Sequence, residues 1–310
     1  MSSFTPSYIR AFRDGRLQEK AQIARKRLEA CDLCPRNCGA NRLSGETGAC
    51  GTGDLAMVSS YDAHFGEERP LVGTGGSGTI FFTWCNLGCN FCQNWEISHQ
   101  GDGTAVTPEI LSDTMIYLQR MGCHNINFVT PSHVVPQILS ALEIAADKGL
   151  YLPLVYNTSG YDRLDTIQLL EGIIDIYMPD FKFWDPRVAE MTCQAADYPE
   201  CARMAIGEMY RQVGDLQTDS QGIAWKGLLI RHLVMPNNLA GTKAVMAFIA
   251  GTLSTTTYVN IMPQYRPCGT ARTVKGLARH ITDQEFADAL EAAKNQGLTR
   301  LDPPSPLFRL

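Results

Sequence analysis

The sequence lacks any apolar run long enough to cross a bilayer, and its first residues lack the apolar core of a secretory signal peptide. It also lacks an excess of positive charge, because 27 Lys and Arg stand against 32 Asp and Glu, for a formal net charge of −5. A chain of this charge has little bulk attraction for nucleic acid or for a membrane surface, although a local basic patch could still form. We therefore expect a cytoplasmic protein with neither nucleic acid nor membrane as a partner.

Cysteine, by contrast, is abundant, with eleven residues in the chain. Cytoplasmic thiols are kept reduced, so clustered cysteines indicate metal binding first and redox chemistry second. Seven of them form two tight clusters: Cys31, Cys34, Cys38 and Cys50, then Cys85, Cys89 and Cys92. The others are scattered, and a lone buried cysteine is commonly a small hydrophobic residue, which is our expectation for Cys123, Cys193 and Cys201.

Most of the sequence after the first cysteine cluster is a repeat of apolar strands and amphipathic helices. Residues 5–30 predict one basic helix and residues 31–76 irregular structure, and from residue 79 the strands alternate with helices. Such repeats imply an α/β fold with a parallel sheet, which we predict to be a partial (β/α)6 TIM-like barrel with an N-terminal Cys-rich metal-binding extension. We divide the chain into an extension, 1–76, and a core domain, 77–310. The six expected strands are 79–84, 125–130, 151–157, 173–181, 227–235 and 257–262.

The cysteines at 85, 89 and 92 follow the first expected strand in one short loop that contains Gly88. Three thiolates can bind three irons of a [4Fe–4S] cluster and leave the fourth iron open for another ligand. Two alternatives remain at this point: three buried structural thiols, or a zinc site completed by a distant His or Cys. The competing function class is a non-catalytic metal protein, either an iron–sulfur electron carrier or a zinc-stabilised binding protein.

This loop resembles the cluster motif of radical S-adenosylmethionine (SAM) enzymes, including the aromatic Phe91 before the last cysteine. The resemblance implies that SAM chelates the open iron and is cleaved reductively to methionine and a 5′-deoxyadenosyl radical, which abstracts hydrogen from a substrate. It also implies an electron donor such as flavodoxin or ferredoxin.

Further matches at the strand ends resemble the activating enzymes of glycyl radical enzymes, pyruvate formate-lyase activating enzyme in particular. "MPDFK" resembles that family's Leu-Asp-x-Lys, which implies that Asp180 and Lys182 contact the ribose and the carboxylate of SAM. "RHLVMP" gives Arg231 a role on the cofactor side, and "MPQY" places Tyr265 near the ribose. The implied substrate is a glycine of a partner enzyme. The alternative is a small molecule or a peptide.

Two strand ends depart from that family's pattern. "TPSH" stands where the family has Gly-Gly-Glu, so Thr130, Ser132 and His133 could supply acceptors for the SAM ammonium but no carboxylate. "NTSG" replaces Asp-Thr-Asn-Gly, so Asn157 and Ser159 stand in a segment where the family has an acid.

The upstream segment has the spacing Cys-x2-Cys-x3-Cys-x11-Cys, which satisfies the ligand count of a closed zinc site or an auxiliary Fe–S cluster. A thiol–disulfide pair at its Cys-x2-Cys is the third reading. For Arg36 and Arg42 in this segment, we expect solvent-exposed side chains. Cys268 lies at the last strand end, where it could act as a radical relay or simply pack as a small hydrophobic residue. Trp84 and Trp95 flank the three-cysteine loop and are expected to shield it from water.

Overall fold

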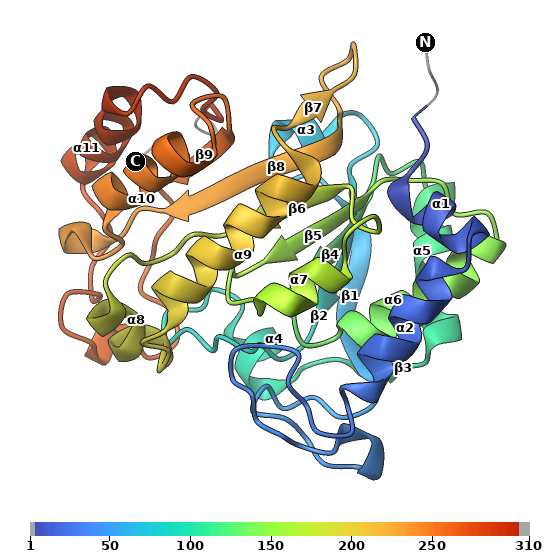
Figure 1. Cartoon of the computed structure of the whole chain (residues 1–310). Helices are drawn as coiled ribbons and strands as arrows, with labels where there is room; N and C mark the ends of the chain where they lie inside the picture. The colour runs from blue at the N-terminus through green and yellow to red at the C-terminus, as the bar shows by residue number, and fades with distance from the viewer. Residues whose placement is uncertain (1–3, 304–310) are drawn as a thin grey trace.

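The computed structural model describes residues 4–303, and this part of the chain contains a sheet of nine strands (Figure 1). Six of them run parallel, each beside the next, and they are the six strands that the sequence predicts. In spatial order they are β2 (Ser77–Phe82), β4 (Ile126–Val129), β5 (Leu154–Thr158), β6 (Ile176–Pro179), β8 (Ala224–Leu233) and β9 (Tyr258–Met262). The prediction of a mixed α/β fold with a parallel-rich sheet is therefore confirmed.

Helices connect these strands and cover the sheet (Figure 1). Thr107 caps one of them by accepting the Ile110 N–H, and Thr282 and Glu285 form a capping box on the last. Pro136 lies in the first turn of another, where proline lacks only an N–H that has no helical partner. The connecting helices are α5 (Pro108–Arg120), α6 (Val135–Asp147), α7 (Leu164–Leu169), α8 (Pro186–Cys193), α9 (Tyr198–Val213), α10 (Thr242–Phe248) and α11 (Asp283–Asn295).

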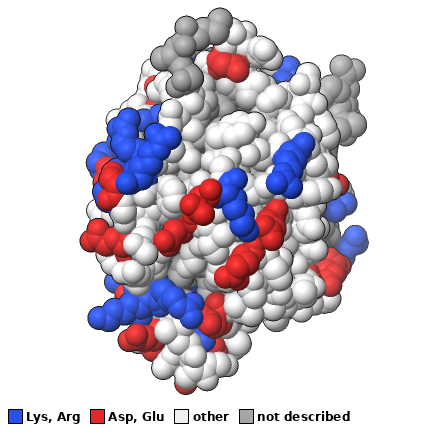
Figure 2. All heavy atoms as spheres, turned by 90° about the vertical axis from the view of Figure 1, so that its right-hand side faces the viewer, with Lys and Arg blue, Asp and Glu red and all other residues white. Residues whose placement is uncertain are grey.

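The expected basic helix over residues 5–30 is two helices, α1 (Ser7–Arg13) and α2 (Arg16–Lys26). Gly15, with φ of 79°, breaks them apart because a left-handed backbone cannot continue a helix. The basic side chains of this region pair with acids, as Arg25 does with Asp54 at 2.9 Å. Figure 2 shows acidic and basic groups interspersed on this face, so the helices form a solvated surface rather than a basic patch there.

The sheet extends beyond the predicted strands, because part of the segment expected to be irregular is a strand. β1 (Ala56–His64) runs antiparallel to β2 and carries the short edge strand β3 (Thr104–Val106). Only the first part of β1 alternates buried and half-buried residues, and its polar second half concealed the strand in the sequence. Three further short elements were not predicted: α3 (Arg69–Val72), α4 (Trp95–Gln100) and β7 (Gln217–Thr218).

Of the helices within residues 4–303, none combines the length and the apolar character that a bilayer crossing requires.

Candidate cofactor site at the strand ends

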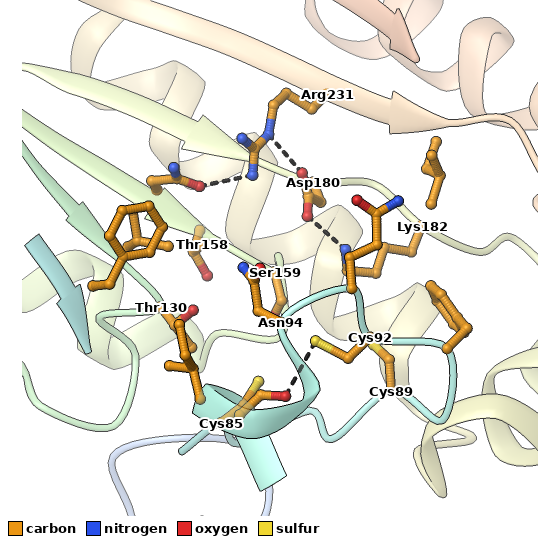
Figure 3. Close-up of a pocket in the computed structure, with 18 of the residues that line it drawn as sticks. Cys85, Cys89, Cys92, Asn94, Thr130, Thr158, Ser159, Asp180, Lys182 and Arg231 are labelled. Carbon is orange, nitrogen blue, oxygen red and sulfur yellow. Dashed lines mark hydrogen bonds and ion pairs between the residues drawn. The ribbon is translucent and has the colours of Figure 1, made fainter. Parts of the chain in front are cut away.

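The carboxyl ends of the parallel strands and the loop after β2 enclose a cavity of about 280 Å³. We call residues 83–94 the cysteine loop. It forms one side of the cavity, while the ends of β4, β5, β6 and β8 form the other (Figure 3). The polar side chains along the cavity include those of Cys85, Cys89, Cys92, Asn94, Thr130, Asn157, Thr158, Ser159, Asp180, Lys182, Arg231 and Gln264.

The three thiols of the cysteine loop lie on one wall of the cavity (Figure 3). Gly88, with φ of 64°, allows the loop to turn, and the Cys92 N–H closes it on the Cys89 carbonyl at 3.1 Å. Burial raises the pKa of Cys85 to about 12, with a contribution from Cys89, and burial also raises the pKa of Cys92. Thiols in such an environment become ligands only when a metal compensates the negative charge.

No three His, Cys, Asp or Glu side chains in residues 4–303 are gathered closely enough to hold a single metal ion. A cubane cluster makes a different demand, because it takes one thiolate on each of three irons. The three cavity-facing thiols fit that demand by ligand type and number.

A buried ionic network faces the cysteine loop across the cavity. The Arg231 Nε lies 2.7 Å from Asp180 Oδ1, and its Nη2 donates to Asn157 Oδ1 at 2.7 Å. Lys182 Nζ lies 2.5 Å from the other oxygen of Asp180. Burial by itself would raise the pKa of Asp180, but the two cations outweigh it and the pKa falls below its ordinary value. Burial likewise opposes the charge on Lys182, yet Asp180 and Cys89 hold its pKa above the ordinary value.

A second carboxylate, Glu67, approaches this network and was not predicted. Its Oε2 lies 3.7 Å from Arg231 Nη1, and the side chain is 8% exposed. Burial raises the pKa of Glu67 to about 7, with Glu68 adding to the shift and Arg231 opposing it. Glu67 is not among the residues that line the cavity, so it supports Arg231 from behind. The only signal in the sequence was a pair of acids before Pro70 in a segment expected to be irregular.

Four residues named from the sequence do not reach the cavity. Ser132 is buried and its hydroxyl lies 3.1 Å from that of Thr158. The Tyr265 hydroxyl donates to the Leu277 carbonyl at 2.8 Å, which leaves Gln264 in the lining in its place. His133 and Cys268 are also absent from the lining. His133 bonds the Thr83 carbonyl through Nε2 at 2.9 Å, which accounts for it as a core residue.

The four upstream cysteines are neighbours in space. A Cβ placed on Gly48 would lie 3.3 Å from Cys38 Sγ and 3.4 Å from Cys50 Sγ, so these two sulfurs flank one glycine. Burial raises the pKa of Cys34 to about 12, and the thiols of Cys50 and Cys31 contribute to that shift. This donor set is all thiol, a ligand type that suits zinc and iron–sulfur clusters alike, but its sulfurs are not gathered around one metal-ion position among residues 4–303.

The expectation that Arg36 and Arg42 are exposed is wrong. Arg42 is fully buried, because its guanidinium donates to the carbonyls of Gly53 and His133. Arg36 is half-buried and crosses from the upstream segment to the cysteine loop. It donates to the Asn86 carbonyl at 2.9 Å and the Leu87 carbonyl at 3.0 Å on that loop, and to the carbonyls of Cys193 and Gln194 at the end of α8.

Replacing Arg36 with alanine is expected to lower the free energy of unfolding by about 2 kcal/mol, because four carbonyls lose a charged hydrogen-bond donor. The loss is no larger because some of these carbonyls can then hydrogen-bond to water. Arg36→Lys should recover little of this, since one ammonium cannot span both segments. Chemical denaturation of the two variants measures the effect. Arg187→Ala, at a side chain that is 90% exposed, is the matched control and should stay within about 0.5 kcal/mol of the parent. Equal stability of the Arg36 and Arg187 variants would contradict a stabilising role for the hydrogen bonds from Arg36 to the cysteine loop and α8.

The two tryptophans beside the cysteine loop are held differently. Trp84 lines the cavity in a left-handed backbone conformation, with φ of 64°. Its ring lies against Gly51 and Gly101, where a Cβ would come within 2.6 Å and 2.4 Å. Trp95 stacks on His99 at a centroid distance of 3.8 Å. The expected shielding of the loop stays a prediction.

His232, next to Arg231, is expected to make the stability of the fold depend on pH. Burial lowers the pKa of His232 to about 4, and its ring nitrogens bond the Phe181 carbonyl and the Thr242 hydroxyl. A histidine with a lowered folded pKa stabilises the fold fully above its unfolded value, near 6.5, and loses that contribution as the pH falls toward 4. We expect His232 to contribute a slope of about 1.4 kcal/mol per pH unit across that window.

Urea unfolding between pH 4 and 7 measures this slope. His232→Gln should flatten it by about one proton's worth relative to the parent protein. The same slope in the parent and in His232→Gln would show that His232 is not the responsible group.

Comparisons with known proteins bear on this site. Residues 79–214 match the model of the radical SAM superfamily. An uncharacterised protein of Methanocaldococcus jannaschii is 31% identical over 289 residues, which is 91% of this chain and 79% of that protein.

Among solved structures, one supports a likeness at the level of the fold. A radical SAM methyltransferase from Sphaerobacter thermophilus aligns with a TM-score of 0.50 at 13% identity, over 74% of this chain and 66% of that one. A methylornithine synthase aligns with a TM-score of 0.44 at 16% identity, over 73% and 71% of the two chains. The family match therefore identifies residues 79–214 as a domain of the radical SAM superfamily, whose members cleave SAM with an iron–sulfur cluster.

Proposed function

We propose that this protein is an enzyme that holds a [4Fe–4S] cluster on Cys85, Cys89 and Cys92 and binds SAM in the adjoining cavity. The single observation that carries the proposal is that three thiols and a buried Asp–Lys–Arg network line the same cavity. When bound, the cluster and SAM supply an electron and a 5′-deoxyadenosyl radical that abstracts hydrogen from a substrate.

The chain's own residues would bind and orient the cofactor. The Lys182 ammonium suits the SAM carboxylate, because an ammonium is a compact charge that can leave Asp180 for a second anion. Asp180 would accept from the ribose hydroxyls, while Arg231, which also lines the cavity, holds Asp180 and Asn157 in position. The oxygen atoms of Thr130 and Ser159 would receive the SAM ammonium. The apolar side of the cavity, which includes Phe91 and Met262, excludes water from these contacts.

The finer assignments follow from resemblance. We propose a glycyl radical enzyme activase-like role, with a glycine of a partner protein as substrate and a flavodoxin or ferredoxin as electron donor. A small molecule or peptide is the second candidate, favoured because residues 130–133 carry no carboxylate. We further propose that the six parallel strands act as a partial (β/α)6 barrel in a core domain, 77–310, and that the upstream cysteines bind zinc or an auxiliary cluster in an extension, 1–76.

The test is anaerobic reconstitution with iron and sulfide, reduction with dithionite and addition of SAM. We expect 5′-deoxyadenosine and methionine to form. A protein with a spectroscopically verified [4Fe–4S] cluster that forms neither product would overturn the proposed function.

The substrate is tested separately by supplying deuterated candidates, either a glycine-labelled partner protein or a labelled small molecule. Deuterium that appears in 5′-deoxyadenosine identifies which class provides the hydrogen.

A further inference from the structure

Each of the three thiols in the cysteine loop has a hydrogen-bond donor from outside the set of proposed ligands. The Leu87 N–H approaches Cys85 Sγ at 3.4 Å, and the Ser98 hydroxyl approaches Cys92 Sγ at 3.1 Å. The third donor, Cys193, comes from α8, 104 positions along the chain from Cys89, and its sulfur lies 3.4 Å from Cys89 Sγ. Cys193 was expected to be a small hydrophobic residue, and its contact with a proposed ligand gives it a more specific role.

The position of Cys193 is fixed by contacts that join the end of α8 to the cysteine loop. The Asn90 N–H donates to the Thr192 carbonyl at 2.9 Å, and its side-chain amide donates to the Met191 carbonyl at 3.2 Å. Arg36 adds a hydrogen bond to the Cys193 carbonyl at 2.7 Å. Cys193 itself is only 3% exposed. The hydrogen bonds to the carbonyls of residues 191–193 therefore fix the position of a buried thiol against Cys89.

Cys193 lies on the side of the cysteine loop away from the SAM cavity. It lines a second cleft of about 650 Å³ between the loop, the upstream segment and α8, which shares Trp84, Cys85 and Ser98 with the cavity, but Cys193 itself does not line the cavity. A fourth cluster ligand would have to point into the cavity, toward the open iron. The position of Cys193 therefore suits a hydrogen-bond partner of the Cys89 sulfur better than a fourth ligand of the cluster.

We propose that the Cys193 thiol donates a hydrogen bond to the Cys89 sulfur when that sulfur ligates the cluster, as a positioning residue that raises the reduction potential. This inference rests on the proposed function. A ligating Cys89 carries no proton, so Cys193 must be the donor of the pair. The Thr192 hydroxyl, 3.5 Å from the same sulfur, is a competing acceptor, but it is neutral whereas Cys89 becomes an anion.

Hydrogen bonds to cluster sulfurs affect the potential through charge. Reduction adds an electron to the cluster, and part of the added charge is carried by the sulfurs. A donor at Cys89 therefore stabilises the reduced form more than the oxidised form, and its removal makes the cluster harder to reduce.

The experiment compares Cys193→Ala and Cys193→Ser with the parent in an EPR-monitored redox titration of the reconstituted protein, at equal iron content per chain. We expect the midpoint potential of Cys193→Ala to shift to more negative values, and that of Cys193→Ser to return toward the parent because the hydroxyl restores a donor. Ser98→Ala, which removes the donor to Cys92, should shift the potential in the same direction. Cys201→Ala, at a scattered cysteine that bonds Asp197, is the matched control and should not shift it.

An unshifted potential in Cys193→Ala would overturn the inference and leave the proposed function standing, as would equal shifts for alanine and serine, which would indicate lost packing. A full cluster retained in Cys89→Ala but lost in the Cys89→Ala/Cys193→Ala double variant would show that Cys193 is a ligand, which also overturns it. Failure of the parent protein to hold any [4Fe–4S] cluster would overturn both proposals.

Discussion

Replacing Cys85 with alanine is expected to reduce 5′-deoxyadenosine formation to the background level. Two thiolates cannot hold three irons of a cubane, so neither the cluster nor its open coordination position would assemble. Iron and acid-labile sulfide analysis after anaerobic reconstitution, together with chromatography of the SAM cleavage products, measures the two parts of this effect.

The controls for this prediction use the chain's other cysteines. Cys123→Ala makes the same substitution at a buried cysteine outside the two clusters, and should retain the cluster at a cost of about 1 kcal/mol in stability. Metal that survives in a Cys85/Cys89/Cys92 triple variant reports the upstream segment alone, as zinc or as residual iron. Full SAM cleavage by Cys85→Ala would contradict the assignment of the cluster to this loop.

Replacing Asp180 with asparagine is expected to have the second largest effect, on both stability and cofactor binding. Arg231 and Lys182, whose side chains are 18% and 15% exposed, would remain without the carboxylate they share, and breaking a largely buried pair in this way costs about 3 kcal/mol. Affinity for SAM should fall as well, because the ribose loses an acceptor and Lys182 loses its orientation.

Denaturant unfolding and equilibrium binding of SAM measure the two effects of Asp180→Asn. The matched control is Asp113→Asn, which removes an exposed partner of Lys148 and should change stability by at most about 1 kcal/mol. The pH dependence supplies a further check: the carboxyl of Asp180 has a lowered folded pKa, so its contribution is present above the unfolded value and is lost in acid. Equal losses in the two variants would argue against a stabilising network at Asp180.

The sequence predicts well those parts of the fold whose signal is local. Each of the six parallel strands is a short apolar run, and Asp180 and Lys182 follow one of them directly, so their place at the cavity follows from strand order. β1 was missed because its second half is polar and stays exposed beside β2, and α4 because six residues give no usable periodicity.

The contacts that sequence could not reveal are those made over long chain separations. Arg36 looks like a surface arginine until its acceptors at Cys193 and Gln194 are known, and Cys193 looks like an ordinary buried thiol until Cys89 is found beside it. Glu67 has the same character, since its partner Arg231 is far along the chain. For Tyr265 the sequence predicted a contact that the structure does not have. Its motif was recognised, but its hydroxyl donates to the nearby Leu277 carbonyl and so does not reach the cavity.

The reach of Arg36 also sets an order of events during synthesis. As the ribosome extends the nascent chain, Arg36 and the cysteine loop emerge early, whereas the carbonyls of Cys193 and Gln194 follow more than 150 positions after Arg36. Such separated contacts form late, because the intervening chain must first be ordered. The thiols thus emerge well before the elements that secure their loop, so a prematurely terminated chain would present them without these contacts.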